Sequence, residues 1–519
     1  MKSKTTSCPA CGAPVEFHNP GSLVVVCEYC QSAVARGDKD PEDFGKVADL
    51  VETDSPIRQG TSGKFRDSHF TVAGRVQYKH PAGGVWDEWY LAFPGNRWGW
   101  LAEAQGKFYL TLERPLKSSQ APDFDSLEVG SRITIRDKEF AVAEKGTATA
   151  LGAEGEIPWL FRPGAEHKFA DLQGPNNAFA TLDFGEDAIK LYLGVELTLD
   201  KLQLDHHDWH APVTATVVPG KLLNCPQCGG QIELLAPDKS ECVTCANCAS
   251  LLDATEGKLR YLQTLKEKDV HVSIPLGTEG TFGASKYTVI GFMERYTMYE
   301  GRAYPWSEYL LYNSDLGFRW LVESDRHWTF VESVSASDVK STFSSAVKYG
   351  GQKYRLFDKG TAFVRHVLGE FYWKVQIGET VQTADYIAPP HMLSVEKSFT
   401  TKSEEINYSH ATYMTPEQVE NAFGLKSGSL PKAWGVGPCQ HAPDVGVAIF
   451  MLWPVFLFII FVTHLMFSRP GSTSGSSAGV MFFAMVVVSL FPVGVIMYQR
   501  NFEVRRWADS DYSPYATDD

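Results

Sequence analysis

Short apolar runs broken by glycine and polar residues make up most of the chain, and this pattern is typical of β-strands. Strict alternation appears in stretches such as Phe140-Ala-Val-Ala143 and Tyr354-Arg-Leu-Phe357, where every second side chain would be buried. The 13 Trp, 21 Tyr and 31 Phe residues supply ample material for several cores. The pattern predicts antiparallel β-structure almost throughout.

Helical patterns are sparse. The best candidate in the body of the chain is residues 415–423, with Thr415 as N-cap and Pro416 as the first helical residue. Near the end, Gly446–Phe467 and Ala478–Tyr498 run for 22 and 21 residues without Asp, Glu, Lys or Arg. Each would cross a hydrocarbon core of about 30 Å as a helix. Such charge-free length favours a membrane hairpin over two buried core helices.

Basic residues flank this hairpin on one side. The loop between the runs carries only Arg469, whereas the flanks carry Lys426, Lys432, Arg500, Arg505 and Arg506. Positive residues near membrane segments favour the cytoplasmic side. The sequence therefore predicts a protein of the plasma (inner) membrane with both termini in the cytoplasm.

The chain contains one sequence unit twice. Three of the matches are Gly60-Thr-Ser-Gly63 with Gly277-Thr-Glu-Gly280, Trp86-Asp-Glu-Trp-Tyr90 with Trp306-Ser-Glu-Tyr-Leu310, and Glu144-Lys-Gly-Thr-Ala148 with Asp358-Lys-Gly-Thr-Ala362. Each unit also holds a half-repeat, since Gly60, Phe70 and Val72 recur 70 residues later as Gly130, Phe140 and Val142. We expect each unit to form antiparallel β-structure, as small barrel-like or rolled meanders related by pseudo-symmetry.

Nine of the ten cysteines lie in two clusters with the CxxC spacing of zinc sites. The predicted ligands are Cys8, Cys11, Cys27 and Cys30 in the first copy and Cys225, Cys228, Cys245 and Cys248 in the second. Alignment of the copies makes Cys242 a spare thiol. Four thiolates leave no open position, so both Zn²⁺ ions are expected to be structural, in a reducing compartment. No role is predicted for Cys439.

These features divide the 519 residues into six predicted parts. They are zinc ribbons at 5–40 and 221–256, β-rich repeats at 55–205 and 270–424, a transmembrane hairpin at 446–498 and a cytoplasmic tail at 499–519. The formal net charge of -14, without a basic run, argues against a nucleic-acid partner.

The acid-Lys-Gly-Thr-Ala motif is the most enzyme-like feature. Lys145 and Lys359 could pair with Glu144 and Asp358 next to them, or with Glu156 and Glu370 further along. The simpler interpretation is a tight turn with the lysine and the acid in solvent, and it is favoured because no nucleophile–base pair accompanies the motif.

Other polar residues carry weaker signals. Glu88 and Glu308 fall opposite their aromatic neighbours on alternating strands, so we expect them to be exposed. His206, His207 and His210 could bind a metal, but the second copy has no counterpart.

The second copy resembles the bacterial family called domain of unknown function 4178. The resemblance is carried by Gly277-Thr-Glu-Gly280, Tyr287-Thr-Val-Ile-Gly291, Trp306-Ser-Glu-Tyr309, Asp358-Lys-Gly-Thr-Ala362, Gly369-Glu-Phe-Tyr-Trp373 and Tyr386-Ile-Ala-Pro-Pro390. The first copy matches over Gly60 to Leu204. The family carries no assigned activity, so the resemblance implies a fold class without a mechanism. It also implies partners among phage-shock-type membrane-stress proteins or polyamine-synthesis enzymes.

The sequence thus favours a non-catalytic, membrane-anchored recognition or scaffold protein. Its duplicated ribbons and β-domains would bind a protein or a ligand at the cytoplasmic face, and oligomerisation is left open. The alternative is an enzyme with a cleft around the Lys-Gly-Thr-Ala and Glu…Trp motifs.

Overall fold

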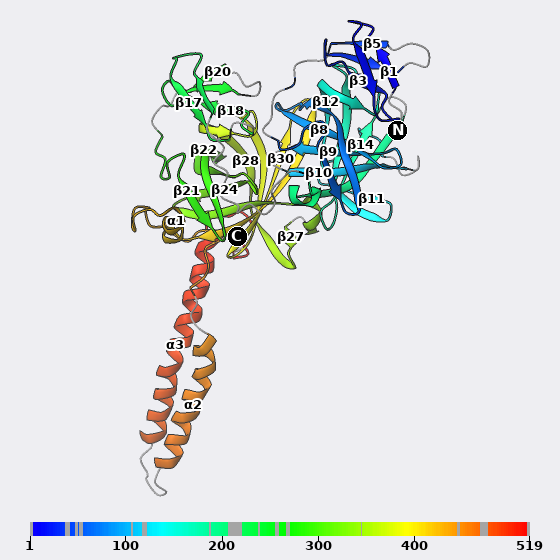
Figure 1. Ribbon diagram of the computed structural model, residues 1–519. Helices are drawn as coiled ribbons and strands as arrows, with labels where there is room; N and C mark the ends of the chain where they lie inside the picture. Colours follow the sequence, from blue (N-terminus) through cyan, green and yellow to red (C-terminus); the bar gives the residue numbers. More distant parts are fainter. Residues whose placement is uncertain are drawn as a thin grey trace.

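The computed structural model shows two β-rich bodies side by side and a helical hairpin that leaves the second body (Figure 1). It describes residues 4–36, 42–46, 50, 55–104, 107–116, 122–185, 188–205, 221–236, 239–254, 259–265, 270–343, 345–443, 447–467 and 476–515. The prediction of a mainly β chain with two tandem β-domains is confirmed.

Each body begins with a ribbon of short strands. In the first ribbon β1 (Lys4–Ser7) pairs with β2 (Pro14–Phe17), and β3 (Val24–Val26) pairs with β4 (Ser32–Ala35), which also pairs with β5 (Glu42–Lys46). The second ribbon repeats this plan with β16 (Lys221–Asn224), β17 (Gln231–Leu234), β18 (Cys242–Thr244), β19 (Ser250–Asp253) and β20 (Arg260–Thr264).

Eight strands of the first copy close into an antiparallel barrel, called barrel 1 below. Around the ring they are β7 (Ser68–Lys79), β8 (Val85–Phe93), β9 (Arg97–Ala104), β10 (Lys107–Arg114), β15 (Ile189–Leu197), β14 (Ala178–Phe184), β13 (Glu166–Gln173) and β12 (Lys138–Ile157). Pairing of β12 with β7 closes the ring. The short strands β6 (Ser62–Phe65) and β11 (Arg132–Ile135) pair with β7 and β12, which gives the two halves of the barrel the same plan. The 3₁₀ turn η2 (Leu199–Leu202) follows β15.

The second copy forms barrel 2 with the same connectivity. Its ring is β22 (Ser285–Tyr299), β23 (Arg302–Asn313), β24 (Gly317–Ser324), β25 (His327–Val334), β31 (Ser403–Met414), β30 (His391–Phe399), β29 (Thr380–Ala388) and β28 (Gln352–Phe371), which pairs back with β22. The accessory elements are β21 (Glu279–Phe282), η3 (Ala336–Asp338), β26 (Lys340–Phe343) and β27 (Ala346–Tyr349). An eight-stranded barrel has an interior that side chains can fill or that can hold one small ligand.

Much of the apolar core of barrel 1 lies on the outer face of its strands, which points away from the barrel interior. Trp89 and Leu91 are fully buried there, in a cluster with Phe70 under Leu202 and Leu204. Burying a large apolar side chain stabilises the fold by about 1.5–3 kcal/mol. This leaves the inward positions of the strands free to carry polar groups.

The two barrels are joined by a strand pairing. The N-terminal half of β12 pairs with β31 of barrel 2, with Glu144 opposite Glu405 and Gly146 opposite Ser403. Around this pairing, the Lys402 ammonium lies 2.7 Å from Glu166. The copies therefore form one continuous β-structure, in which the two barrels lie side by side (Figure 1).

The predicted turn at Lys-Gly-Thr-Ala is wrong in both copies. The motifs lie inside the 20-residue strands β12 and β28. The glycine permits a close approach of neighbouring groups, which is a usual reason for glycine within a strand. A Cβ on Gly146 would lie 3.3 Å from the Lys402 carbonyl oxygen, and one on Gly360 would lie 3.1 Å from the Thr297 hydroxyl.

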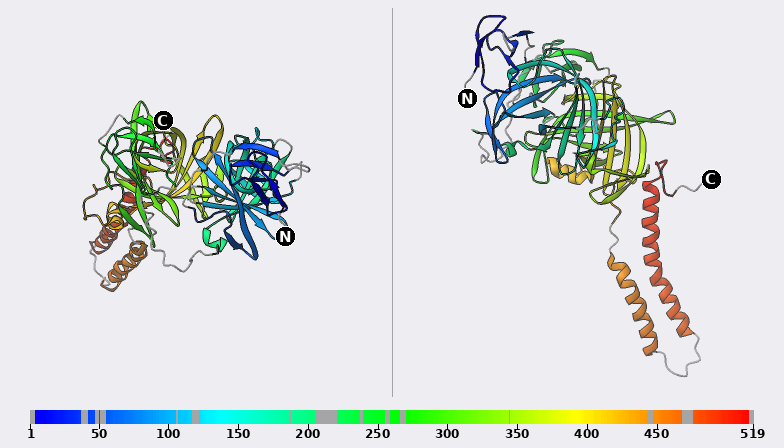
Figure 2. Two further views of the ribbon diagram at one scale, coloured as in Figure 1. Left: turned by 45° about the horizontal axis from the view of Figure 1, so that its top comes forward. Right: turned by 90° about the vertical axis from the view of Figure 1, so that its right-hand side faces the viewer.

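The three α-helices of the described residues lie after the strands of the second barrel. The predicted helix is confirmed as α1 (Pro416–Phe423), with Thr415 as N-cap in a capping box and Pro416 at the first position. The helices α2 (Val447–Phe467) and α3 (Ser476–Arg506) form a hairpin that projects away from the barrels (Figure 2). Among the described residues, Ala478–Arg506 is long and apolar enough to cross a membrane, while Met451–Met466 is a shorter apolar helix.

The end of α3 is fixed to barrel 2. The Arg506 guanidinium, buried and paired with Glu503, donates to the carbonyls of Gly437 at 3.2 Å and Pro438 at 2.9 Å. Trp507 packs on Phe357. Arg506, which the sequence counted among the basic flanks of the hairpin, is therefore also bound to the protein body.

Candidate metal centres and binding cavity

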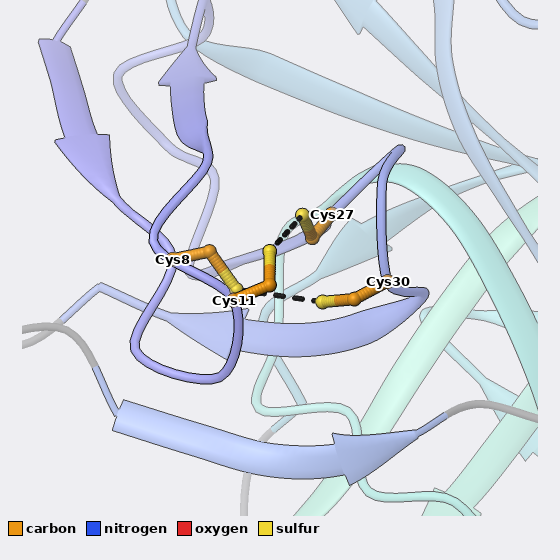
Figure 3. A group of neighbouring side chains, drawn as sticks. All are labelled: Cys8, Cys11, Cys27 and Cys30. Carbon is orange, nitrogen blue, oxygen red and sulfur yellow. Dashed lines mark hydrogen bonds between the residues drawn. The ribbon is translucent and has the colours of Figure 1, made fainter.

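The eight predicted zinc ligands form two compact sulfur clusters. In each cluster the four sulfurs lie within 4.8 Å of one another. Figure 3 shows the first, where Cys8 and Cys30 sulfurs are 3.6 Å apart and Cys11 and Cys27 sulfurs 3.8 Å apart. In the second, the Cys225–Cys248 and Cys228–Cys245 separations are both 3.7 Å.

These separations suit a tetrahedral metal. With a Zn–S bond of about 2.3 Å, the edge of a ZnS₄ tetrahedron is about 3.8 Å. All ten cysteines are free thiols. Either cluster could hold a metal ion, and four sulfurs would complete its coordination.

The backbone forms a tight turn after each CxxC pair, and this turn favours the clustering of the sulfurs. Gly12 and Gly229 have φ of +77° and +72°, and the amide of each donates to the carbonyl of the first cysteine at 2.8 Å. Gln31 and Ala249 adopt the same left-handed conformation after the second pair. The same tight turn therefore occurs four times.

Cys242 lies outside the second cluster. Its sulfur is fully buried and contacts the Trp373 carbonyl oxygen at 3.4 Å. The residue forms part of β18 and pairs with Phe371 of barrel 2, as Val24 of β3 pairs with Ile157 of barrel 1. The interpretation of Cys242 as a spare thiol agrees with this position, which is one of core packing.

A buried glutamate attaches each ribbon to its barrel. In the first copy the Glu156 carboxylate accepts hydrogen bonds from the His18 amide at 2.8 Å, the Asn19 amide at 2.9 Å and the Ser22 hydroxyl. In the second copy the carboxylate of Glu370 accepts from the Leu235 amide at 2.5 Å, the Ala236 amide at 3.0 Å and the Ser240 hydroxyl at 2.6 Å. We call these two residues the clamp glutamates.

The clamp glutamates are therefore structural in both copies. Their exposed fractions are 4% for Glu156 and 2% for Glu370, and each carboxylate accepts bonds from three residues of its ribbon. The sequence identified both residues as candidate partners of a catalytic lysine, but neither contacts Lys145 or Lys359 among the described interactions.

The lysines of the motif also lie apart from the expected partners. The Lys145 ammonium donates to the Leu127 carbonyl at 2.7 Å and lies 3.4 Å from Glu404 of barrel 2. Glu144 instead pairs with His80, 2.5 Å away. Lys359 is exposed.

His206, His207 and His210 lie outside the described residues, and Cys439 is buried beside Trp507.

A cavity of about 2160 Å³ extends through the barrels, and exposed residues such as Tyr304 and Trp434 line part of it. Inward side chains from all eight strands of barrel 1 and from the strands of barrel 2 line it. Its wall combines aromatic rings with carboxylates. In barrel 1 the aromatic part includes Tyr78, Trp86, Tyr90, Trp100, Trp159 and Tyr192.

The expectation that Glu88 and Glu308 are exposed is wrong. Both line the cavity, and Glu308 is 8% exposed. The barrel closes over the face that the sequence placed in solvent. Burial raises the pKa of Glu88 to about 7, although bonds from Trp86 and Tyr90 oppose the shift.

Further cavity acids were missed by sequence reasoning. Burial raises the pKa of Asp171 to about 8, helped by the charge of Glu144, and burial also raises the pKa of Asp183. In barrel 2 the Arg295 guanidinium bridges Glu308 at 3.1 Å and Glu396 at 2.8 Å. These residues stand at inward positions of strands, which becomes visible only once the barrel register is known.

Comparison with known proteins gives one informative match. A model of the family described as domain of unknown function (DUF4178) matches residues 58–198 and 275–416, once in each barrel. No curated protein matches the chain. A crystal structure of a protein with unknown function from the DUF3598 family of Nostoc punctiforme PCC 73102 shares 10% identity over 68% of this chain and 94% of that one. Its TM-score of 0.11 carries no argument about fold or function.

Proposed function

The chain belongs to the domain of unknown function (DUF4178) family through both barrels, and we propose that it is a non-catalytic, membrane-anchored recognition protein whose barrels receive a ligand. The observation that carries this proposal is the cavity, with carboxylates and aromatic rings on inward strand positions. Concave sites with a few placed polar groups are the usual form of small-molecule sites.

The ribbons support this interpretation as rigid parts of the scaffold. We propose that Zn²⁺ occupies both sulfur clusters and is structural, because four thiolates leave no position for a substrate. The clamp glutamates hold each ribbon against its barrel, so a ribbon and its barrel would present one surface to a protein partner.

The helical hairpin supplies the anchor in this proposal. Both α2 and α3 would lie in the plasma (inner) membrane, with the barrels and both termini on the cytoplasmic side, in keeping with the basic flanks. Protein partners at that face would come from membrane-stress proteins of the phage-shock type or from polyamine-synthesis enzymes. That choice of partners rests on the family resemblance alone.

An enzyme is the second candidate. It is favoured by the raised pKa values of Glu88 and Asp171 in the cavity, since such shifts gather at catalytic sites. Against it, the clamp glutamates are engaged with the ribbons, and Lys145 is engaged with Glu404. Recognition therefore accounts for more of the described contacts.

Membrane anchoring is tested with charges placed in α3. Val486→Asp combined with Leu490→Asp should release the chain from the membrane fraction, since each aspartate at the centre of a span costs about 3 kcal/mol. Leu222→Asp, at an exposed ribbon position, is the control. Retention of the double variant in carbonate-washed membranes would refute α3 as an essential part of the anchor.

Recognition by the second ribbon is tested by capture from detergent-solubilised membranes. Cys245→Ser combined with Cys248→Ser removes two sulfurs from the second cluster, and Cys27→Ser with Cys30→Ser is the matched change in the first. We expect loss of captured proteins together with loss of one metal per chain. An unchanged set of captured proteins for both double variants would exclude a docking role for the ribbons.

A further inference from the structure

The two barrels carry the same pair of inward acids. The glycine of the Lys-Gly-Thr-Ala motif fixes the comparison: Gly146 lies opposite Phe169, which lies opposite Asp183, while Gly360 lies opposite Thr383, which lies opposite Glu396. Asp183 and Glu396 are therefore equivalent. Glu88 and Glu308 are equivalent too, because each stands two residues after the inward tryptophan of its strand.

Barrel 2 neutralises its pair with its own arginine. The Arg295 side chain is 6% exposed, bridges Glu308 and Glu396, and lies 5.7 Å from the centre of the Trp306 ring. The Trp306 indole also donates to Glu308 at 2.6 Å. This arrangement is a cation held between two carboxylates and over an aromatic face.

Barrel 1 has a tyrosine where barrel 2 has this arginine. Tyr78 lies opposite Trp86 in the strand ladder, as Arg295 lies opposite Trp306. Its ring stacks on Trp86 with centroids 5.2 Å apart. The acid pair of barrel 1 thus keeps its aromatic neighbours without the guanidinium.

No cation of the described residues takes that place. Glu88 and Asp183 form no ion pair in the part of the chain that the structure describes. His167 and Lys190 lie near enough for their charges to oppose the rise of the Asp183 pKa, but neither is paired with Asp183, and Lys190 is exposed. The Oδ1 atom of Asp183 and the Nε2 atom of His167, beside Tyr78, are buried without a hydrogen-bond partner among the described residues. A buried carboxylate oxygen without a donor is costly and points to a missing partner.

We propose that barrel 1 binds a small alkylguanidinium or alkylammonium ion between Glu88 and Asp183, at the position that barrel 2 fills with Arg295. The ligand would donate hydrogen bonds to both carboxylates and lie against the Tyr78 and Trp86 rings. A free small molecule fits better than a protein side chain because the two acids line the interior of the barrel. This inference rests on the proposed ligand-binding function and names the ligand class and the barrel.

Calorimetric titration of the detergent-solubilised full chain with agmatine, and separately with putrescine, tests the inference. We expect one bound cation per chain, and no binding of 1,4-butanediol, the uncharged analogue of putrescine. Glu88→Gln and Asp183→Asn should each weaken agmatine binding about 10- to 100-fold, the worth of a hydrogen bond to a charged group. Glu396→Gln, the equivalent of Asp183→Asn in barrel 2, should leave the affinity unchanged.

Tyr78→Arg gives barrel 1 the arginine of barrel 2. We expect the new guanidinium to occupy the acid pair, so that agmatine no longer binds while the melting temperature is kept or raised. This outcome separates occupation of the site from misfolding. Affinity of the wild-type chain should also rise as the pH passes about 7, the pKa of Glu88, because the carboxylate is then charged.

Failure of the inference can be distinguished from failure of the proposed function. Absence of binding by both amines would overturn the inference, and so would equal weakening by Glu396→Gln. Binding of an arginine-containing peptide without agmatine or putrescine would assign the site to a protein side chain and would overturn it as well. The proposed function would still stand if membrane anchoring and partner capture behaved as expected.

Discussion

The ribbon joints of the two copies match closely, whereas the barrel interiors differ. At the joints, Glu156 and Glu370 each accept bonds from two backbone amides and one serine hydroxyl of the ribbon. In the interiors, equivalent acids are retained, but Arg295 of barrel 2 is replaced by Tyr78 of barrel 1. Duplication has kept the joint and changed the charge of the cavity.

This difference separates two kinds of site within one fold. At the joint between a ribbon and its barrel, every hydrogen-bond partner of the glutamate comes from the chain itself. Both copies can therefore use the same contacts. An interior that is completed by an arginine in one copy and left acidic in the other has two different binding capacities. We therefore expect changes at the joints to act equally in both copies and changes in the interiors to act unequally.

Metal removal should have the largest effect and should not distinguish the copies. We expect two zinc ions per chain by elemental analysis, and one after either Cys8→Ser or Cys225→Ser. Metal binding contributes about 10–16 kcal/mol to the folding of small zinc domains, so either ribbon should unfold when its metal is lost. Full retention of metal by both variants would contradict the assignment of the clusters.

Loss of the internal arginine should have the next largest effect and should be specific to barrel 2. Arg295→Ala leaves the buried Glu308 and the partly exposed Glu396 without a cation, and the uncompensated charge at Glu308 costs about 3–5 kcal/mol. Ethylguanidine should restore part of the melting temperature by taking the vacated place. Arg365→Ala is the control, because the Arg365 side chain is 46% exposed and an ion pair with such an exposed partner is worth about 0–1 kcal/mol. Equal destabilisation by the two changes would mean that Arg295 does not neutralise the buried carboxylate of Glu308.

The clamp glutamates provide the direct test of equivalence at the joints. Glu156→Gln and Glu370→Gln should each lower the free energy of unfolding by about 1–3 kcal/mol, because buried donors of the ribbon lose a charged acceptor. Glu16→Gln and Glu233→Gln, at matching exposed positions of the two ribbons, should have little effect. Thermal unfolding of the four variants measures these changes in stability. A large loss of stability in one copy only would show that the two joints are not equivalent.

Much of the fold follows from the sequence because its signals are local. Alternating strands, the paired CxxC motifs and the capped helix at Thr415 each depend on residues near one another. The internal repeat in addition predicts that the same unit of structure occurs twice. These signals were sufficient for the mainly β class, the ribbon strands and the choice of Cys248 over Cys242 as the partner of Cys245.

The errors came from contacts between distant residues. Gly146 looked like a turn because glycine usually marks one, but the reason for it lies in strand β31 of the other barrel. Glu88 looked exposed because alternation does not reveal that a sheet closes and encloses its polar face. The equivalence of Asp183 and Glu396 needed the register of six strands, three in each barrel, since the loops of the copies differ in length.

Substitution of Cys242 should have the smallest effect. It tests whether the core packing at the two ribbon joints is also equivalent. Its equivalent in the first ribbon is Val24, and both residues are fully buried in the strand that pairs with the barrel. Cys242→Val should change the free energy of unfolding by less than about 1.5 kcal/mol, as for apolar exchanges of similar size. It should leave two metals bound, whereas Cys245→Val should leave one. Loss of a metal on Cys242→Val would instead place this sulfur among the ligands and would show that the two ribbons hold their metals differently.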